Sequence, residues 1–478
     1  MRPPTATAVK AEVRPQDKSY SILTTAITWL LIVMMSTPMD PSYFFTGRVA
    51  ISDANPVTRV LWLCMFAAAL VIILSRVTVA LRVLRHTNVF LLLFVGLATL
   101  SVAWSIDAQQ TSVRLFRLMV MCSVAVAVAS AGCDARRFQG LVRPPLTALL
   151  VGSILFCLLN PAAGIHHEPS PELLNAWHGL FQTKNDLGPA AAFGFIFWTH
   201  AWMSRERGRW RAFAGVLVAA ICLVMSRSST SVIATTLSVM ALLLLMRSPG
   251  SMRRSVKLLS SALILLILLY SLAMLKVVPG LDIILSPIPM ITGKDLTFSN
   301  RSEIWAAVLD HARIRPLLGS GYSAYWIVGI PAHNQESYYI ISRLHGFYPG
   351  SAHNGYLQIM NDLGAVGLIC LLGYVAVYFR QSMRVYVLNR AQGALFLSVL
   401  LQQATINLSE PLWLNVQVLD FVLMTIATTC IARILLDARA ATQRAVTPAA
   451  TSPDESGLQR PRQSWRPQRP GPNHFRRF

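Results

Sequence analysis

Residues 354–379 read NGYLQIMNDLGAVGLICLLGYVAVYF, a run of 26 residues with one charged side chain, Asp362. A transmembrane helix needs about 20 mostly apolar residues, because each residue rises about 1.5 Å and the hydrocarbon core is about 30 Å thick. This stretch therefore predicts a membrane-spanning helix. Apolar runs of similar kind recur on both sides of it along the chain.

The composition of the whole chain points to the same class of protein. The sequence has 478 residues, of which 54% are hydrophobic and 13% are charged. Its mean hydropathy is +0.51. Soluble proteins carry about 25% charged residues, and disordered chains are poor in hydrophobic residues. The composition therefore excludes both classes and predicts an all-α, polytopic membrane protein.

Twelve apolar stretches could each form a transmembrane helix, and three of them (the second, fifth and seventh) are short. Their order along the chain leaves one connection, before the tenth stretch, much longer than the others. The stretches are residues 21–39, 60–75, 88–106, 113–131, 144–160, 187–203, 212–226, 229–246, 258–277, 354–379, 391–409 and 414–436.

The net charge of +21 is distributed in a way that predicts the orientation of the spans. If the N-terminus is inside, each inner connection holds three or four Lys or Arg, and eight more follow Leu436. The short outer connections hold few, among them Arg48, Lys184 and Arg227. Because Lys and Arg accumulate on the cytoplasmic side, both termini are predicted to be cytoplasmic. The basic excess is read as a topology signal, so we expect a lipid bilayer and no nucleic acid as partner.

The predicted organisation has five parts. Residues 1–20 form a cytoplasmic arm, 21–277 hold spans one to nine, 278–353 form a large outer loop, 354–436 hold the last three spans, and 437–478 form a disordered basic tail. In the loop, Asn300 and Glu303 fit a capping box. They predict a helix over residues 304–314 that Pro316 ends.

The seven cysteines lie in spans or at their cytoplasmic ends, and none lies in an outer loop. Disulfides belong to oxidising compartments. The sequence therefore predicts no structural disulfide, and it contains no CxxC pair for a metal. The pair His166-His167, next to Glu168, is read as solvated loop rather than as a metal site, because adjacent side chains point in different directions.

Three residues at the outer face are the main candidates for chemistry. Arg227 lies where the charge pattern disfavours an Arg, Arg301 opens the loop helix, and His353 lies where the loop re-enters the membrane. Arg can donate two parallel hydrogen bonds to a phosphate, and a helix N-terminus favours anions. His is the commonest general base. Each also has an ordinary alternative: a snorkelling Arg, an ion-paired Arg and a capping His.

Five further residues are weaker candidates for substrate binding. Lys184 and Asn185 could contact the acceptor path or a diphosphate, Tyr322 and Tyr356 could stack on sugars, and Glu410 could orient His353. Each of these side chains is more often structural than functional.

Several motifs occur in an order that resembles the superfamily of O-antigen ligases and Wzy-type polysaccharide polymerases, over roughly residues 88–410. The exopolysaccharide polymerase branch is the most similar. The motifs are Ser226-Arg227, Arg301-x-x-x-Trp305, the run RPLLGSGY from Arg315 to Tyr322, HNGYL from His353 to Leu357, LGAVG from Leu363 to Gly367, WSID from Trp104 to Asp107 and TKNDLG from Thr183 to Gly188.

The resemblance implies a GT-C-type glycosyltransferase of the bacterial inner membrane that needs no metal or other cofactor. Its donor would be an undecaprenyl-diphosphate-linked glycan, used at the periplasmic face. By motif, Arg227 and Arg301 would bind the diphosphate, and His353 would be the general base of an inverting displacement. A separate chain-length regulator protein is a possible partner of such a polymerase.

Three functions stay open at this point. The first is a polymerase of exopolysaccharide or O-antigen repeat units. The second is a ligase, active in lipopolysaccharide biosynthesis, that transfers the glycan to a lipid A core acceptor. The third is a twelve-span transporter of polysaccharide or lipid-linked sugar. The late outer loop and the lack of buried acidic residues expected for proton coupling argue against the transporter.

Overall fold

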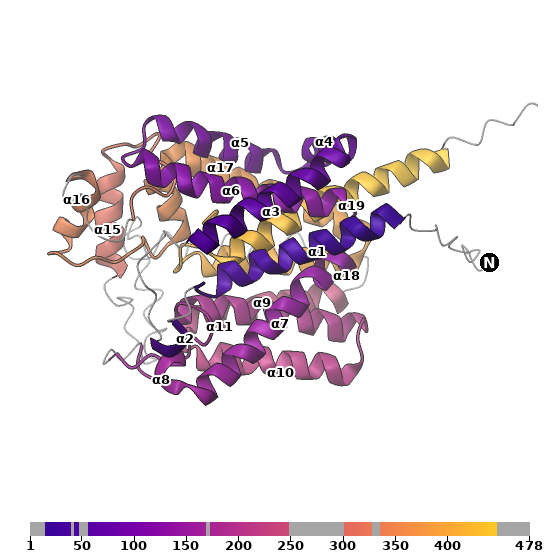
Figure 1. Ribbon diagram of the computed structural model, residues 1–478, viewed down its shortest axis with the longest axis horizontal. Coiled ribbons are helices and arrows are strands. Elements are labelled where there is room, and N and C mark those ends of the chain that lie inside the picture. The colour runs from indigo at the N-terminus through magenta and orange to yellow at the C-terminus, as the bar shows by residue number, and fades with distance from the viewer. Residues whose placement is uncertain are drawn as a thin grey trace, which may run out of the picture. The chain divides into compact units, whose positions relative to one another are not determined.

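The computed structural model describes residues 15–39, 43–46, 56–168, 173–247, 301–326 and 335–446 (Figure 1). In these residues the regular structure is helical, apart from one isolated bridge between Ile165 and Trp177. The chain divides into two units, Met1–Asp437 and Ala438–Phe478. The helices are α1 (Pro15–Ser36), α2 (Tyr43–Thr46), α3 (Pro56–Ser75), α4 (Val77–His86), α5 (Val89–Leu100), the 3-10 turn η1 (Ser101–Ala103), α6 (Ala108–Ser130), α7 (Ala135–Leu159), α8 (Pro161–Gly164), α9 (Lys184–Ser204), α10 (Arg209–Met225), α11 (Ser229–Arg247), α15 (Arg301–Ala312), α16 (Gln335–Arg343), α17 (Gly355–Leu388), α18 (Arg390–Ile406) and α19 (Leu419–Val446).

The prediction of an all-α, polytopic membrane protein is confirmed. Seven of the described helices are long and apolar enough to cross a membrane, and an eighth candidate is a bent pair. α9, α10 and α18 occupy expected spans but are shorter or less apolar than these. The expected ninth span, 258–277, and the loop segment 278–300 lie outside the described residues. A count of twelve spans therefore stays an expectation.

Several boundaries differ from the sequence reading, and two of the differences affect the fold. The third expected span, 88–106, corresponds to α5 and η1, and α4 precedes it at an angle of 100°. Asn88 makes this break possible, because its side chain accepts from the Phe90 amide and donates to the Tyr374 carbonyl. At the other end of the chain, α19 continues to Val446, beyond Leu436 where the last span was expected to end.

Small side chains allow the helices around α9 to pack closely. α9 packs against α7, α10, α11 and α18, and α17 packs against α5 and α18. Ala190, Ala191 and Ala192 of α9 are fully buried. Small residues at helix contacts let backbones approach, which is the usual basis of association between helices in membranes. In Figure 1, α15 and α16 lie at the same end of this bundle as α2 and α8, and α1 begins at the opposite end.

The most informative feature of the fold is a break in α17. Gly364 has φ 64° and ψ −162° inside this helix, a conformation that is essentially restricted to glycine. A break leaves backbone groups without helical partners, and such groups must be paired elsewhere at membrane depth. The run 315–322 supplies the partners. Ser320 and Gly321 donate to the carbonyls of Asn361 and Asp362, and Ala365 and Val366 donate to the carbonyls of Pro316 and Leu317.

The expectation of no disulfide is wrong. Cys133, between α6 and α7, is bonded to Cys430 of α19, with 5.3 Å between their Cα atoms. The two residues are 297 positions apart in sequence. Sequence reasoning could assign both to the same end of the bundle, but only helix packing brings their Cβ atoms into bonding range. Five cysteines remain free.

Candidate functional site

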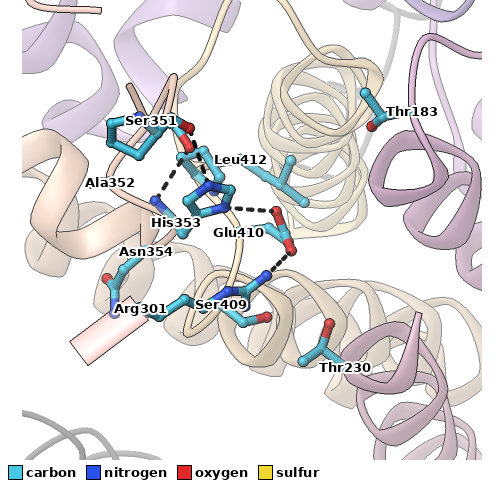
Figure 2. Close-up of polar contacts among 12 residues, drawn as sticks. Thr183, Thr230, Arg301, Ser351, Ala352, His353, Asn354, Ser409, Glu410 and Leu412 are labelled. Carbon is cyan, nitrogen blue, oxygen red and sulfur yellow. Dashed lines mark hydrogen bonds and ion pairs between the residues drawn. The ribbon is translucent and has the colours of Figure 1, made fainter. Parts of the chain in front are cut away.

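His353 lies on a tight turn just before α17 (Figure 2). Its backbone is left-handed, with φ 45°, which is uncommon for a residue with a side chain. The His353 amide donates to the Ser351 hydroxyl at 3.3 Å. Its Nε2 lies 3.2 Å from the carbonyl oxygen of Pro349. The ring is therefore held by its own turn, and its side chain is 27% exposed.

The start of α17 fixes this turn. Asn354 is the N-cap, and its side-chain oxygen accepts from the amides of Tyr356 and Leu357. The Gly355 amide donates to the Asn407 carbonyl at 2.8 Å. A Cβ at Gly355 would lie 2.0 Å from Asn407 Oδ1. Only glycine permits this approach, which ties the His353 turn to the connection between α18 and α19.

The residue before His353 is held from two sides. The Ala352 carbonyl accepts from Trp305 Nε1 at 3.0 Å, and the Ala352 amide donates to Gln358 Oε1 at 3.0 Å. Trp305 belongs to the loop helix α15 and Gln358 to α17. The helix that begins with Arg301 and the turn that carries His353 are thus parts of one packed unit.

Glu410 joins Arg301 and His353 (Figure 2). Its Oε1 accepts from Arg301 Nη2 at 2.9 Å, and its Oε2 lies 3.9 Å from His353 Nδ1. The Glu410 side chain is 6% exposed and that of Arg301 is 17% exposed. A buried carboxylate requires compensating charge or hydrogen bonds. The three side chains come from three separate segments, and together they form an Arg–Glu–His cluster.

Asn407 was missed by the sequence reading and shapes the turn that carries Glu410. Its side-chain oxygen accepts from the amides of Leu412 and Trp413, and its side-chain nitrogen donates to the Gln403 carbonyl. By pairing with backbone groups, the Asn407 side chain satisfies amides that the irregular connection leaves without helical partners. The run Asn407-Leu408-Ser409-Glu410-Pro411 is the sequence signal for this connection.

Arg227 lies in the turn between α10 and α11 and has φ 51°. Its Nη1 donates to the Leu174 carbonyl at 2.8 Å, and the side chain is exposed. The neighbouring Met225 carbonyl accepts from the Trp177 amide, so this turn is bound to the loop 161–183. Among the described contacts, none joins Arg227 to Arg301, His353 or Glu410.

Lys184 and Asn185 lie in the first turn of α9, which begins with a capping box. Thr183 donates to Asp186 Oδ2 from both its amide and its hydroxyl. Lys184 is buried and Asn185 is half-buried. Asp186 is within electrostatic range of Glu410, so this first turn belongs to the surroundings of the Arg–Glu–His cluster. Figure 2 includes Thr183 and Thr230, from the starts of α9 and α11, in the same region.

Tyr322 is buried, and Tyr356 is half-buried. Tyr322 is 1% exposed, donates to the Leu414 carbonyl at 2.7 Å and packs edge-on against Phe94. Burial raises the pKa of Tyr322 well above its ordinary value. The Tyr356 hydroxyl donates to the Ala404 carbonyl at 3.1 Å. Both side chains therefore join the outer loop and α17 to neighbouring segments.

The outer loop 161–183 contains a group of histidines that is separate from the Arg–Glu–His cluster. The rings of His166 and His178 lie 4.6 Å apart, and Tyr43 lies 2.8 Å from His178 Nδ1. Burial lowers the pKa of both histidines. His166 Nδ1 lies 3.1 Å from Glu168, and His167 contacts the Pro161 carbonyl. Within the described residues, no group of three or more His, Cys, Asp or Glu has the arrangement of a metal site.

Comparison with known proteins gives two related findings. Residues 214–372 match the family model described as O-antigen ligase. The chain is also 33% identical over 250 residues to the exopolysaccharide production protein ExoQ of Rhizobium meliloti (strain 1021). That alignment covers 51% of this chain and 55% of the relative, so the chain spans about half the length of the curated relative. Residues 214–372, the stretch that is similar to the O-antigen ligase family, contain Arg227, Arg301 and His353.

Proposed function

We propose that this chain is a glycosyltransferase that polymerises undecaprenyl-diphosphate-linked oligosaccharide repeat units. The observation that carries the proposal is the Arg–Glu–His cluster, in which Arg301 and His353 lie on either side of Glu410. A cation for a departing diphosphate and a base for an attacking hydroxyl are the two groups that this reaction needs. Arg301 and His353 lie within residues 214–372, which match the O-antigen ligase family model, and Glu410 lies after that stretch.

In the proposed reaction, a sugar hydroxyl of the acceptor attacks the anomeric carbon of the donor. The new C–O bond forms as the bond to the diphosphate breaks, and undecaprenyl diphosphate leaves with the electron pair. Arg301, with Arg227, stabilises the developing negative charge in place of a metal ion. His353 takes the hydroxyl proton. Direct displacement of this kind inverts the anomeric centre.

The rest of the molecule has roles that follow from its topology. Twelve spans in a GT-C arrangement would place the site on the periplasmic face of a bacterial inner membrane, with both termini in the cytoplasm. Lys184, Asn185, Tyr322 and Tyr356 would contribute to binding or to the shape of the site. A chain-length regulator would act as a separate protein.

The second candidate is an O-antigen ligase that transfers the glycan to lipid A core. The description of the matching family favours it, whereas the printed name of the relative, which refers to exopolysaccharide production, favours the polymerase. Donor and chemistry are the same in both, and only the acceptor differs.

Reconstitution distinguishes these functions. The purified protein in lipid is given the undecaprenyl-diphosphate repeat unit of its own host as the only glycan, and products are separated on a glycolipid gel. A ladder spaced by one repeat unit is expected. Transfer only after lipid A core is added would make the protein a ligase. No reaction with either acceptor, from a folded preparation, would favour the transporter.

Two variants assign the chemistry. His353→Ala is expected to reduce turnover by about 10²–10⁴-fold, the usual contribution of a positioned base. The matched control is His345→Ala, an exposed histidine in the same loop, which is expected to keep full turnover. Full activity of the His353 variant would remove the base from the proposal.

A further inference from the structure

Glu410 contacts Arg301 closely and His353 only at a longer distance. Its Oε1 makes a hydrogen-bonded ion pair with Arg301 Nη2 at 2.9 Å, whereas its Oε2 is 3.9 Å from His353 Nδ1. Hydrogen bonds between nitrogen and oxygen are usually about 2.7–3.2 Å long, and a separation of 3.9 Å is too long for one. The carboxylate is therefore bound to the arginine and stops short of the histidine by less than 1 Å.

In this arrangement His353 is not ready to act as a base. The Pro349 carbonyl, 3.2 Å from Nε2, can only accept a hydrogen bond, so Nε2 must carry a proton there. The other nitrogen, Nδ1, is buried and has no hydrogen-bond partner within the described residues. An external hydroxyl therefore finds a proton at Nε2 and has no access to Nδ1.

The donor that the proposed function requires would change this balance. A diphosphate carries more charge than a carboxylate and accepts paired hydrogen bonds from a guanidinium group. It would compete with Glu410 for Arg301. A carboxylate released from Arg301 can move toward His353 and accept a hydrogen bond from Nδ1. In this change the ring releases its Nε2 proton to solvent water and takes up a solvent proton at Nδ1, so it stays neutral. Nε2 then becomes the proton acceptor and is no longer held by the Pro349 carbonyl.

We propose that Glu410 is a positioning residue that couples donor binding to the activation of His353. While the site is empty, Glu410 neutralises Arg301 and leaves His353 inactive. When the diphosphate takes over Arg301, Glu410 sets the tautomer of His353 and exposes Nε2 to the acceptor hydroxyl. The inference rests on the proposed function, because it requires a diphosphate at Arg301. It makes the chemistry conditional on the donor being in place.

The variant Glu410→Gln separates the two roles of the carboxylate. It keeps the shape but removes the charge that competes for Arg301, so binding of undecaprenyl diphosphate should become about threefold to tenfold tighter. An amide orients the imidazole poorly and does not stabilise the protonated ring, so kcat should fall by about 10²-fold, within the range for positioned proton transfer. Glu410→Asp, which keeps the charge, should bind the diphosphate like the parent and recover part of kcat.

The measurements are the affinity for undecaprenyl diphosphate, which carries no sugar, and the rate of repeat-unit addition. Weaker or unchanged binding by Glu410→Gln overturns the proposal, and so does a parental kcat. A merely structural Glu410 would lower both quantities together. If Glu410→Gln does not fold, Glu410→Asp decides alone, since unchanged affinity with reduced kcat is required. Arg301→Ala tests the proposed function separately, because undiminished diphosphate binding by that variant would remove the donor site itself.

The chain supplies a matched control. Arg315, Glu336 and His311 form a second Arg–Glu–His arrangement in the outer loop, with 2.9 Å between Arg315 and Glu336 and 3.7 Å between Glu336 and His311. Its histidine is 1% exposed and hydrogen-bonded to Asn361. Glu336→Gln removes the same charge from the same kind of group and should leave both diphosphate affinity and kcat unchanged.

Discussion

The role that a histidine can have in this protein depends on the atoms that surround it. His353 and His311 both lie beside a carboxylate that is paired with an arginine. His353 is 27% exposed, and among the described residues its ring is hydrogen-bonded to a carbonyl of its own turn alone. His311 is enclosed by Asn361, Tyr325 and Tyr339. The partly open histidine suits proton transfer, and the buried one suits a structural role.

His311 makes stability depend on pH. Burial lowers the pKa of His311, and it is the largest effect. Glu336 raises this pKa, and Arg315 lowers it. Because the folded protein binds the proton less readily than the unfolded chain, the stabilisation is present above the unfolded pKa, about 6.5. It is lost as the pH falls through the lower folded pKa. The thermal midpoint of the parent protein should therefore drop more between pH 7.5 and 5.5 than that of His311→Gln. Equal drops would contradict this.

At the scale of helices, the break in α17 links the outer loop to the membrane domain. The run 315–322 completes the backbone hydrogen bonds that Gly364 interrupts. The same run is bound to the segment after α5, through the Ile106 amide and the Ser320 carbonyl and through Trp104 Nε1 and the Leu318 carbonyl. Three motifs that are distant in sequence therefore form one structural joint.

Gly364→Ala tests this joint. A Cβ at Gly364 would lie 2.3 Å from the Leu317 backbone, and the backbone conformation alone costs about 1–3 kcal/mol for other residues. The thermal midpoint should fall, and turnover should fall with it because Arg301 and His353 lose their common support. Gly96→Ala in α5, where a Cβ meets nothing within 4 Å, should be neutral or slightly stabilising. A parental midpoint for Gly364→Ala would exclude the joint as a source of stability.

At the scale of the whole molecule, the side of the membrane on which the site lies decides which substrate pool it can use. The charge pattern predicts that the inner connections, including the one with Arg207, face the cytoplasm, and that α15 lies outside. The Arg313 side chain, just after α15, is 82% exposed, and Arg207 is also exposed.

Cysteine labelling measures this orientation. Arg313→Cys should react with a membrane-impermeant maleimide in intact spheroplasts, whereas Arg207→Cys should react only after permeabilisation. The parent chain gives the background from its own free cysteines. The reverse pattern would place the Arg–Glu–His cluster in the cytoplasm and would contradict a periplasmic polymerase.

The amino-acid sequence alone determined the class of protein and supplied the candidate residues for its chemistry. Apolar length and low charge are local properties, so they predicted most of the described spans. The capping box at Asn300 and Glu303 predicted a helix over residues 304–314, which the structure places at Arg301–Ala312. His353 could be named because a polar motif directly precedes an apolar run. The number of spans and the role of each candidate stay predictions.

Only the tertiary structure decided how these parts meet. The bend between α4 and α5, the Cys133–Cys430 disulfide and the insertion of residues 315–322 into the break of α17 all depend on segments that are far apart in sequence. The position of Glu410 between Arg301 and His353 is of the same kind. Such contacts follow from packing and from the need to pair every buried backbone group. Neither can be worked out from the local sequence, because the partners are distant along the chain.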